Sequence, residues 1–494
     1  MAATYDGANL YWRGQGTHRV APQLHQSNRE KALARVRQLS GKNAGVVLLE
    51  GGHDTCRHNT DHEDLFRQES FFHYLFGVEE PDCCGLIEVS TGKSTLFVPK
   101  LPDEFAVWLG TIPSLDVYKS KYGVDTVLYS HDLEGEVKRL QPECVHLLEG
   151  TNSDSRALMK APEFRDIKPE LDLKHFNVVN TVLYQALCES RCTKTQEEVD
   201  LMKYVSKISS KAHVEVMKAC KPGMFEYQLE SVFLHSVYFN GGCRFSPYTG
   251  IIGAGKHGAF LHYGHSGAPN ACEIPDNSLV LIDMGGEYHG YAADITCTFP
   301  SSGRFTEEQA AVYNAVLAAH TEVIARMKPG VSWFDMHTLA ERVILQGLLE
   351  GGFVRGDVDE MMSNNLGSVF MPHGLGHLLG IDTHDVGGYG YGYPPRPERA
   401  GANKLRTART LETGMVMTVE PGCYFNRYLL HQAFAKETLS QFLVKDKLMA
   451  NIDLGGVRIE DNVLVTSDGC ESFTNVPRSV KDIEEVMAGK EWTA

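Results

Sequence analysis

Two aspartates lie among apolar residues in the stretch 279–300, LVLIDMGGEYHGYAADITCTFP. Asp283 follows a short apolar run and Asp294 lies in a second strand-like run, with three glycines between them. Short apolar runs around a glycine-containing turn are typical of an antiparallel hairpin. A buried carboxylate is costly unless it is paired, so two on paired strands indicate a cation between them. Two solvated carboxylates at a sheet edge are the alternative that this stretch alone leaves open.

From about residue 181 onward the chain repeats itself. One helix is predicted to begin at Thr195, with a T-x-x-E capping box, and another at Thr306, with a T-x-x-Q box. Each is followed by a Lys-Pro-Gly triplet, a second predicted helix and a Gly-Gly pair, in the same order and at nearly the same offset. An internal repeat of this kind predicts two related halves.

Each half also ends with histidines and two acidic residues on predicted strands. The first half has FLHYGH at 260–265 and then the two aspartates; the second has FMPHGLGH at 370–377 and then Glu420 and Glu460. Two halves facing each other across a pseudo-twofold axis would bring four carboxylates together. Four carboxylates cannot all stay ionised at close range without positive charge, and two divalent cations balance them. Such a two-metal site is a hydrolytic device that activates water and polarises a carbonyl.

Composition limits the class of protein. A chain of 494 residues is too long for one ordinary core, so two or more domains are expected. The net charge of −16 argues against a general binder of nucleic acid or of an anionic membrane, and no apolar run approaches membrane-spanning length. The twelve cysteines are scattered, and residues 1–16 lack the basic and apolar regions of a signal peptide. We therefore expect a cytoplasmic protein with reduced thiols.

Short predicted strands and helices alternate through the first part of the chain. Strands are predicted at 45–51, 84–89 and 94–98, and the segment 101–110 presents Trp108. The predicted domains are an N-terminal α/β domain (1–165), a polar linker (166–185) and a catalytic domain (186–494).

Four segments resemble those of the pita-bread metallopeptidases: LIDMGGEYHGYAADITCTF, FMPHGLGHLLGIDTHD, LRTARTLETGMVMTVEPGCY and GGVRIEDNVLV. This group includes methionine aminopeptidases, Xaa-Pro aminopeptidases and Xaa-Pro dipeptidases (prolidases). The resemblance is greatest to the long eukaryotic dipeptidases, because it extends to LFRQESFFHYLFGVEEPDCCG in the N-terminal part. It implies an α/β (α+β) fold, with an N-terminal α/β domain before a pita-bread catalytic domain that has an internal pseudo-twofold repeat.

The resemblance also implies the metal ligands. Asp283, Asp294 and Glu460 would hold one ion, and Asp294, His377, Glu420 and Glu460 the other. Oxygen ligands with one imidazole suit several transition metals. The expected cofactors are two divalent ions per subunit, Mn²⁺ foremost, with Co²⁺ or Zn²⁺ as alternatives.

The family resemblance assigns substrate residues as well. Glu420 would move a proton to the leaving nitrogen, and His262 and His384 would bind the scissile carbonyl and the developing tetrahedral centre. Arg406 would pair with the C-terminal carboxylate of the substrate, a task for which Arg409 is the competitor.

Four further residues have less specific expectations. Tyr248 either lines the pocket or is a core tyrosine. His373 and Arg458 are predicted to support the ligands. Trp108 would reach the site of a partner subunit, unless it is a core tryptophan.

Together these features predict an Xaa-Pro dipeptidase, in which a metal-bridging hydroxide attacks the bond before a C-terminal proline. We expect a homodimer that binds dipeptides and has no nucleic-acid or membrane partner. The alternatives are an Xaa-Pro aminopeptidase acting on longer peptides and a non-catalytic pita-bread binding module.

Overall fold

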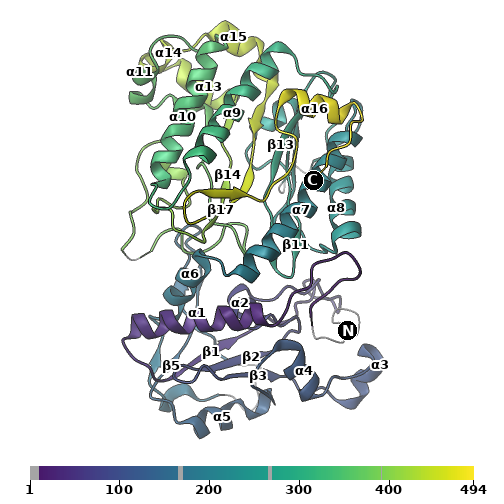
Figure 1. The fold of residues 1–494 in the computed structure, drawn as a ribbon, viewed down its shortest axis with the longest axis vertical. Helices are drawn as coiled ribbons and strands as arrows, with labels where there is room; N and C mark the ends of the chain where they lie inside the picture. Colours follow the sequence, from purple (N-terminus) through teal and green to yellow (C-terminus); the bar gives the residue numbers. More distant parts are fainter. Residues whose placement is uncertain (1–9, 165–170, 265–269, 391, 494) are drawn as a thin grey trace. The chain divides into compact units, whose positions relative to one another are not determined.

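The structure, a computed structural model, describes residues 10–164, 171–264, 270–390 and 392–493 (Figure 1). Its contacts divide the chain into two compact units, Met1–Glu198 and Val199–Ala494, each of which is described by itself. The predicted limits of 1–165, 166–185 and 186–494 stay a prediction. No helix in these described ranges is long and apolar enough to cross a membrane.

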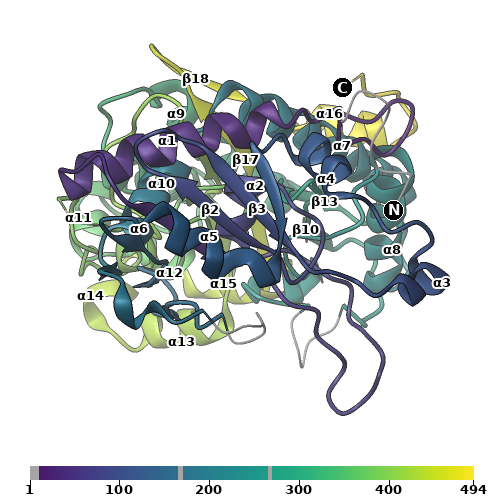
Figure 2. The same cartoon turned by 90° about the horizontal axis from the view of Figure 1, so that it is seen from below.

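A mixed sheet of six strands forms the centre of the first unit (Figure 2). Its order is β4 (Thr126–Tyr129), β3 (Ser94–Val98), β2 (Cys84–Glu88), β1 (Val46–Glu50), β5 (Val145–His146) and β8 (Val178–Val179). The central pairs β1–β2 and β2–β3 are antiparallel and the outer pairs are parallel. The three predicted strands are thus confirmed, whereas β8 adds a strand within the stretch predicted as a linker.

Helices and a small hairpin complete the first unit. They are α1 (Gln23–Ser40), α2 (Ser70–Phe76), α3 (Ala106–Leu109), α4 (Leu115–Tyr122), α5 (Leu133–Leu140), α6 (Leu183–Cys192), β6 (Gly150–Thr151) and β7 (Leu158–Met159). Helix α1 packs against α2 and α6. Trp108 on α3 is 81% exposed, so the alternative of a core tryptophan is wrong.

His25 makes the stability of this unit depend on pH. It is buried on α1 with its Nδ1 3.1 Å from the carbonyl oxygen of Tyr74. Burial, and then the charge of His73, lower the pKa of His25 well below its usual value. Between pH 6.5 and that lowered pKa the unfolded chain takes up a proton that the folded chain refuses, so stability falls as the pH falls.

We expect the free energy of unfolding to decrease by up to about 1.4 kcal/mol for each pH unit below 6.5 on account of this one group. His25→Gln keeps a donor and cannot titrate, so it should lose less stability between pH 7.5 and 5.5. Urea unfolding of both proteins at the two pH values measures this. An equal loss in the two proteins would show that His25 does not contribute.

The second unit is built from two similar halves. In the first half, α7 (Gln196–Ala219) and α8 (Glu226–Gly241) precede the sheet β13 (Thr296–Pro300), β10 (Leu279–Asp283) and β9 (Ile251–Ala254). In the second, α9 (Glu307–Arg326) and α10 (Trp333–Glu350) precede the sheet β14 (Val416–Val419), β17 (Asp461–Val465) and β18 (Cys470–Ser472). Figure 1 shows α9 and α10 packed side by side, as their contacts require.

Shorter elements complete this unit: the pairs β11 (Glu287–Tyr288) with β12 (Tyr291–Ala292) and β15 (Gly422–Tyr424) with β16 (Gly456–Arg458), and helices α11 (Val358–Ser363), α12 (Gly367–Phe370), α13 (Arg427–Phe434), α14 (Glu437–Ser440), α15 (Lys445–Ala450) and α16 (Val480–Met487).

Both predicted capping boxes are present. The Thr195 hydroxyl accepts from the Glu198 amide at 3.3 Å, and Glu198 Oε2 accepts from the Thr195 amide at 2.7 Å. Thr306 and Gln309 make the same reciprocal pair at 3.2 and 3.0 Å. These boxes fix where the first helix of each half begins.

The predicted hairpin is confirmed in its pairing and differs at its turn. Strands β10 and β13 are antiparallel, with Asp283 opposite Thr296. The glycine-rich connection contains the small hairpin β11–β12, and β13 begins only at Thr296. Asp294 therefore lies just before the strand that was predicted to carry it, as Glu460 lies just before β17.

Candidate metal centre

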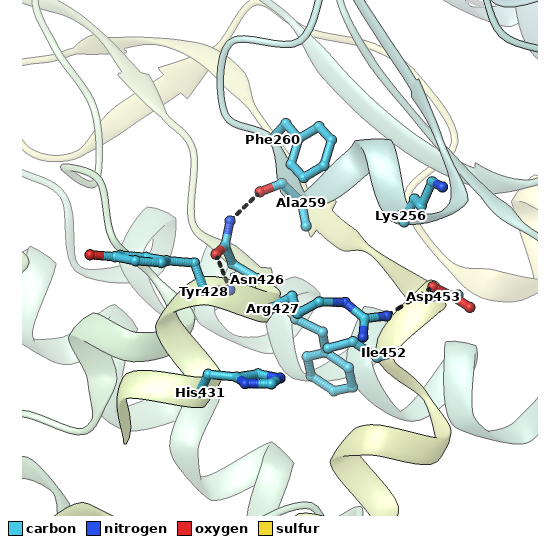
Figure 3. A pocket seen from close by; sticks show the side chains of 10 residues that line it. Lys256, Ala259, Phe260, Asn426, Arg427, Tyr428, His431, Ile452 and Asp453 are labelled. Atoms are coloured by element: carbon cyan, nitrogen blue, oxygen red, sulfur yellow. Dashed lines mark hydrogen bonds and ion pairs between the residues drawn. The ribbon is translucent and has the colours of Figure 1, made fainter. Parts of the chain in front are cut away.

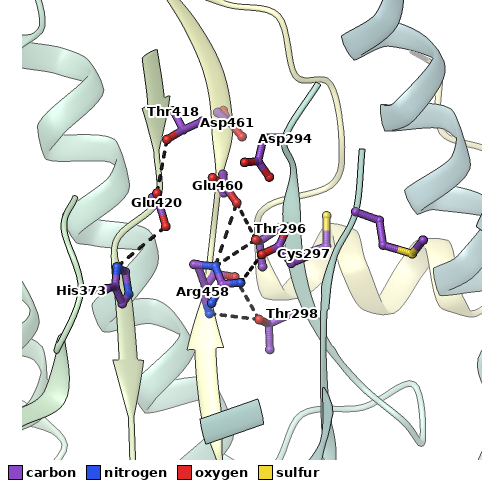
Figure 4. A network of polar contacts seen from close by, with 12 residues as sticks. Asp294, Thr296, Cys297, Thr298, His373, Thr418, Glu420, Arg458, Glu460 and Asp461 are labelled. Atoms are coloured by element: carbon purple, nitrogen blue, oxygen red, sulfur yellow. Dashed lines mark hydrogen bonds and ion pairs between the residues drawn. The ribbon is translucent and has the colours of Figure 1, made fainter. Parts of the chain in front are cut away.

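Four carboxylates meet where the sheets of the two halves end. Asp283 is the last residue of β10, and Glu420 directly follows β14. Asp294 lies two residues before β13, the strand that pairs with β10, and Glu460 directly precedes β17, the strand that pairs with β14. Figure 4 shows Asp294, Glu420 and Glu460 near one another, on segments of both halves. The pseudo-twofold relation inferred from the sequence thus positions the acids.

His377 lies among these carboxylates with one nitrogen turned toward them. Its Nε2 is 3.4 Å from Asp294 Oδ2 and 3.5 Å from Glu420 Oε1. Its Nδ1 is 3.0 Å from the Leu378 carbonyl oxygen, to which it can only donate. That hydrogen bond leaves Nε2 as the unprotonated nitrogen of the neutral ring, which is the arrangement that metal-binding histidines use.

Ligand atoms of Asp294, His377 and Glu460 lie within 4.8 Å of one another, and all three residues are buried. Glu420 adjoins this group through its contact with His377 and accepts from the Thr418 hydroxyl at 3.3 Å. The structure therefore brings together the four residues predicted for one ion.

Arg458 supplies the positive charge nearest to Asp283. Its Nη2 donates to Asp283 Oδ2 at 2.5 Å, and its Nη1 donates to the Tyr424 hydroxyl at 2.8 Å. Its Nε donates to the Thr296 hydroxyl, which in turn donates to Glu460 Oε2 at 2.6 Å (Figure 4). Arg458 was predicted to support the ligands, and its contacts have that form.

The acids have more negative charge than their surroundings balance. Burial, and then the charge of Asp294, raise the pKa of Asp283 to about 7. Burial and the same neighbour raise the pKa of Glu460 well above its usual value, and burial raises that of Glu420. Asp283 Oδ1 and Asp294 Oδ1 are buried without a hydrogen-bond partner. Divalent cations fit this donor set, because they supply the missing charge and use the unpaired oxygens.

The predicted substrate histidines lie around the same centre. The rings of His384 and His377 are edge to face with centroids 4.6 Å apart. His262 is on an exposed turn, and its charge is among the causes that lower the pKa of His373, after burial and Arg458. His373 Nδ1 is 3.8 Å from Glu420 Oε2. Burial and the charges of Asp283 and Asp294 raise the pKa of the Tyr248 hydroxyl, as expected of a tyrosine beside the site.

The two candidate arginines have different surroundings. Arg409 is buried, donates to the Gly387 carbonyl at 2.9 Å, pairs with Glu412 and lies 3.5 Å from the centroid of the Tyr393 ring. Arg406 is only half-buried, and its charge acts on both Glu420 and His384. This difference favours Arg406 for binding a substrate anion.

A cavity of about 520 Å³ lies elsewhere in the second unit (Figure 3). Asn426 crosses it, donating to the Ala259 carbonyl at 3.0 Å and capping α13. None of the predicted ligands is among the residues that line this cavity, so the cavity is not part of the candidate metal centre.

Sequence analysis missed Thr296 and Thr418, whose hydroxyls bind the carboxylates of Glu460 and Glu420. Thr296 follows the ligand Asp294 by two residues, and Thr418 precedes the ligand Glu420 by two residues. Residues two positions apart share one face of an extended segment. That periodicity is the signal that could have found them.

Thr296→Val should weaken metal binding by about 10- to 100-fold, because it removes the hydroxyl that orients Glu460. Thr298→Val is the matched control: Thr298 lies two residues along the same strand and donates to a backbone carbonyl, that of Arg458. Calorimetric titration of the chelator-stripped proteins with Mn²⁺ measures both. Equal affinities would contradict a role for Thr296 at the centre.

Comparison with known proteins gives matches over both units. Residues 200–467 match metallopeptidase family M24, and residues 25–148 match the N-terminal domain of aminopeptidase P. A human protein named Xaa-Pro dipeptidase is 48% identical over 97% of this chain and 96% of its own length. A probable Xaa-Pro aminopeptidase of Verticillium alfalfae is 37% identical over 90% of this chain and 92% of its own.

The comparison with solved structures agrees with the sequence comparison. Aminopeptidase PepP of Pseudomonas aeruginosa has a TM-score of 0.75 and 31% identity, covering 95% of this chain and 98% of that one. Escherichia coli aminopeptidase P, solved with substrate, has the same TM-score and 30% identity over the same shares. The fold expected from the sequence, an N-terminal domain before a pita-bread domain, is confirmed.

Proposed function

This chain belongs to metallopeptidase family M24, and from that premise we infer that it is a metal-dependent hydrolase that cleaves dipeptides ending in proline. The observation that carries the proposal is the cluster of Asp294, His377, Glu420 and Glu460 beside Asp283, with buried oxygens that have no other partner. A non-catalytic binding module has no need of this set, so its presence disfavours that alternative.

Two divalent ions are the proposed cofactors, Mn²⁺ foremost and Co²⁺ or Zn²⁺ as alternatives. Asp283, Asp294 and Glu460 would hold one ion, and Asp294, His377, Glu420 and Glu460 the other. When bound, the ions supply a nucleophilic hydroxide near neutral pH and polarise the scissile carbonyl.

The residues of the chain bind the substrate and move the proton. A peptide bond to proline involves a nitrogen without hydrogen, so that nitrogen must be protonated to leave. Glu420 is suited to this step because burial raises its pKa and because it borders His377 and His373. His262 and His384 would donate to the carbonyl oxygen, and Tyr248 would line the pocket.

Arg406 would bind the carboxylate of the C-terminal proline. An interaction of that kind requires the substrate to end directly after proline, and it therefore favours dipeptides over longer peptides. An Xaa-Pro aminopeptidase remains the second candidate, since the solved structures of similar fold include aminopeptidases P.

We propose further that the protein is a cytoplasmic homodimer. Support comes from its cysteines, which form no disulfide in the described part of the chain, and from the exposed apolar side chains of α3, including Trp108, which suit contact with a partner subunit.

Hydrolysis of Gly-Pro and Gly-Pro-Ala by the Mn²⁺-loaded protein tests the function. Glycine release from Gly-Pro alone, abolished by a chelator, is the expected result. Faster cleavage of the tripeptide would identify an aminopeptidase and remove the role of Arg406. No cleavage of either peptide by protein with confirmed metal would favour the binding module.

A further inference from the structure

A second group of possible metal ligands lies in the first half of the second unit, outside the carboxylate centre. Glu226 at the start of α8, His257 and Cys272 have ligand atoms within 4.8 Å of one another. None of them is among the predicted ligands or substrate residues. From their chemistry and placement we propose that these three residues form a separate site for one thiophilic divalent cation such as Zn²⁺.

The backbone holds two of the three donors in register. The Glu226 amide donates to the Cys272 carbonyl at 2.9 Å, and the Cys272 amide donates back to Glu226 Oε2 at 3.1 Å. His257 Nδ1 is 3.0 Å from Glu226 Oε1, and its ring stacks on Tyr263 with centroids 4.6 Å apart. The side chains of Glu226 and His257 and the backbone of Cys272, which come from three segments, are thus held beside one another before any ion binds.

Exposure increases along the group from inside to outside. Glu226 is fully buried, the His257 side chain is 16% exposed and Cys272 is exposed. A cation can therefore enter from the Cys272 side and meet the buried carboxylate last. Within the described part of the chain, the ion pair of Glu226 is with His257, a weak base, rather than with an arginine or lysine. Glu226 also accepts from the Ala254 and Cys272 amides and from the Tyr263 hydroxyl, and a cation would add the full positive charge that these neutral donors do not supply.

The donor set selects the type of ion. One thiolate, one imidazole and one carboxylate are ligands of tetrahedral Zn²⁺, with water at the fourth position. Bonds of about 2.0–2.3 Å at the tetrahedral angle place donors roughly 3.5 Å apart. These donors lie within 4.8 Å of one another, so they need to approach by at most about 1.3 Å. A thiolate discriminates against Mn²⁺, whereas the carboxylate centre has only oxygen and nitrogen ligands.

Binding exchanges one proton for the ion. The Cys272 thiol loses its proton to solvent, and the neutral His257 ring binds through one nitrogen while keeping its proton on the other. Affinity should therefore rise with pH. Tyr263 donates to Glu226 Oε2 at 2.6 Å and directly follows His262, so a bound cation also restrains the turn that carries His262.

Spectroscopy with Co²⁺ distinguishes this site from the carboxylate centre, because only a cysteine site gives a thiolate-to-cobalt charge-transfer band. Mn²⁺-loaded full-length protein titrated with Co²⁺ should develop this band and saturate at one ion per chain. Cys272→Ser should abolish the band, and His257→Gln should weaken the cobalt affinity at least tenfold. Cys56→Ser, which changes another exposed cysteine, should retain the full band.

Melting temperatures measured without cobalt establish that each variant is folded, and the band does not require peptidase activity. A wild-type protein without the band, or a Cys272→Ser protein that keeps it, would overturn the proposal.

Discussion

Glutamine in place of Glu460 should abolish metal binding and hydrolysis together. Glu460 is the buried carboxylate whose pKa is raised well above its usual value by burial and by Asp294, and a neutral amide cannot supply its negative charge to an ion. Loss of a residue that supports a metal ligand lowers metal affinity or activity by up to about 100-fold. Glu460 is itself a proposed ligand, so kcat for Gly-Pro should fall by more than about 100-fold. Elemental analysis after dialysis should show less than the wild-type metal content.

Glu471→Gln is the matched control for this substitution. Glu471 is on β18 of the same sheet, and its exposed ion pair with Lys203 contributes little. With a chelator present, Glu460→Gln should unfold at no lower temperature than the wild type. The reason is that the loss of one buried charge relieves the repulsion among the carboxylates of the centre. Full metal content in Glu460→Gln would refute its assignment as a ligand.

Arg406→Ala should raise KM for Gly-Pro by about 10- to 100-fold. A hydrogen-bonded pair between charged groups is worth about 1.5–3 kcal/mol, and each 1.4 kcal/mol is a factor of ten in binding. The effect should vanish for Gly-Pro amide, since that substrate has no carboxylate for the guanidinium to bind. Steady-state kinetics on the two substrates measures the difference.

Arg409→Ala gives the contrasting result that completes this test. Its guanidinium holds the Gly387 carbonyl, Glu412 and the Tyr393 ring, so its loss should lower the melting temperature and affect both substrates alike. A carboxylate-dependent KM effect in Arg409→Ala, with none in Arg406→Ala, would exchange the two roles.

The acids of the centre could be found from the sequence because the repeat carries them. Asp283 with Asp294, and Glu420 with Glu460, each follow the same order of helix caps and strand runs, and the structure pairs the strands beside them as expected. The pattern can be recognised in both halves because each capping box and each strand is formed by residues that are close together in the sequence.

The contacts between distant segments could not be read in this way. The Thr296 hydroxyl donates to Glu460, and Arg458 donates to Asp283, although the residues of these two pairs lie 164 and 175 positions apart in the sequence. The group of Glu226, His257 and Cys272 has no regular spacing either. Only the folded backbone, through the reciprocal bonds of Glu226 and Cys272, brings it together.

We propose that the buried acids and His377 hold the ions on which hydrolysis depends. The most direct test uses chelator-stripped protein titrated with Mn²⁺. Bound metal and Gly-Pro hydrolysis are measured on the same samples. We expect no hydrolysis without metal and full activity at two ions per chain, apart from any thiolate-bound ion. Undiminished hydrolysis in the stripped protein would contradict it.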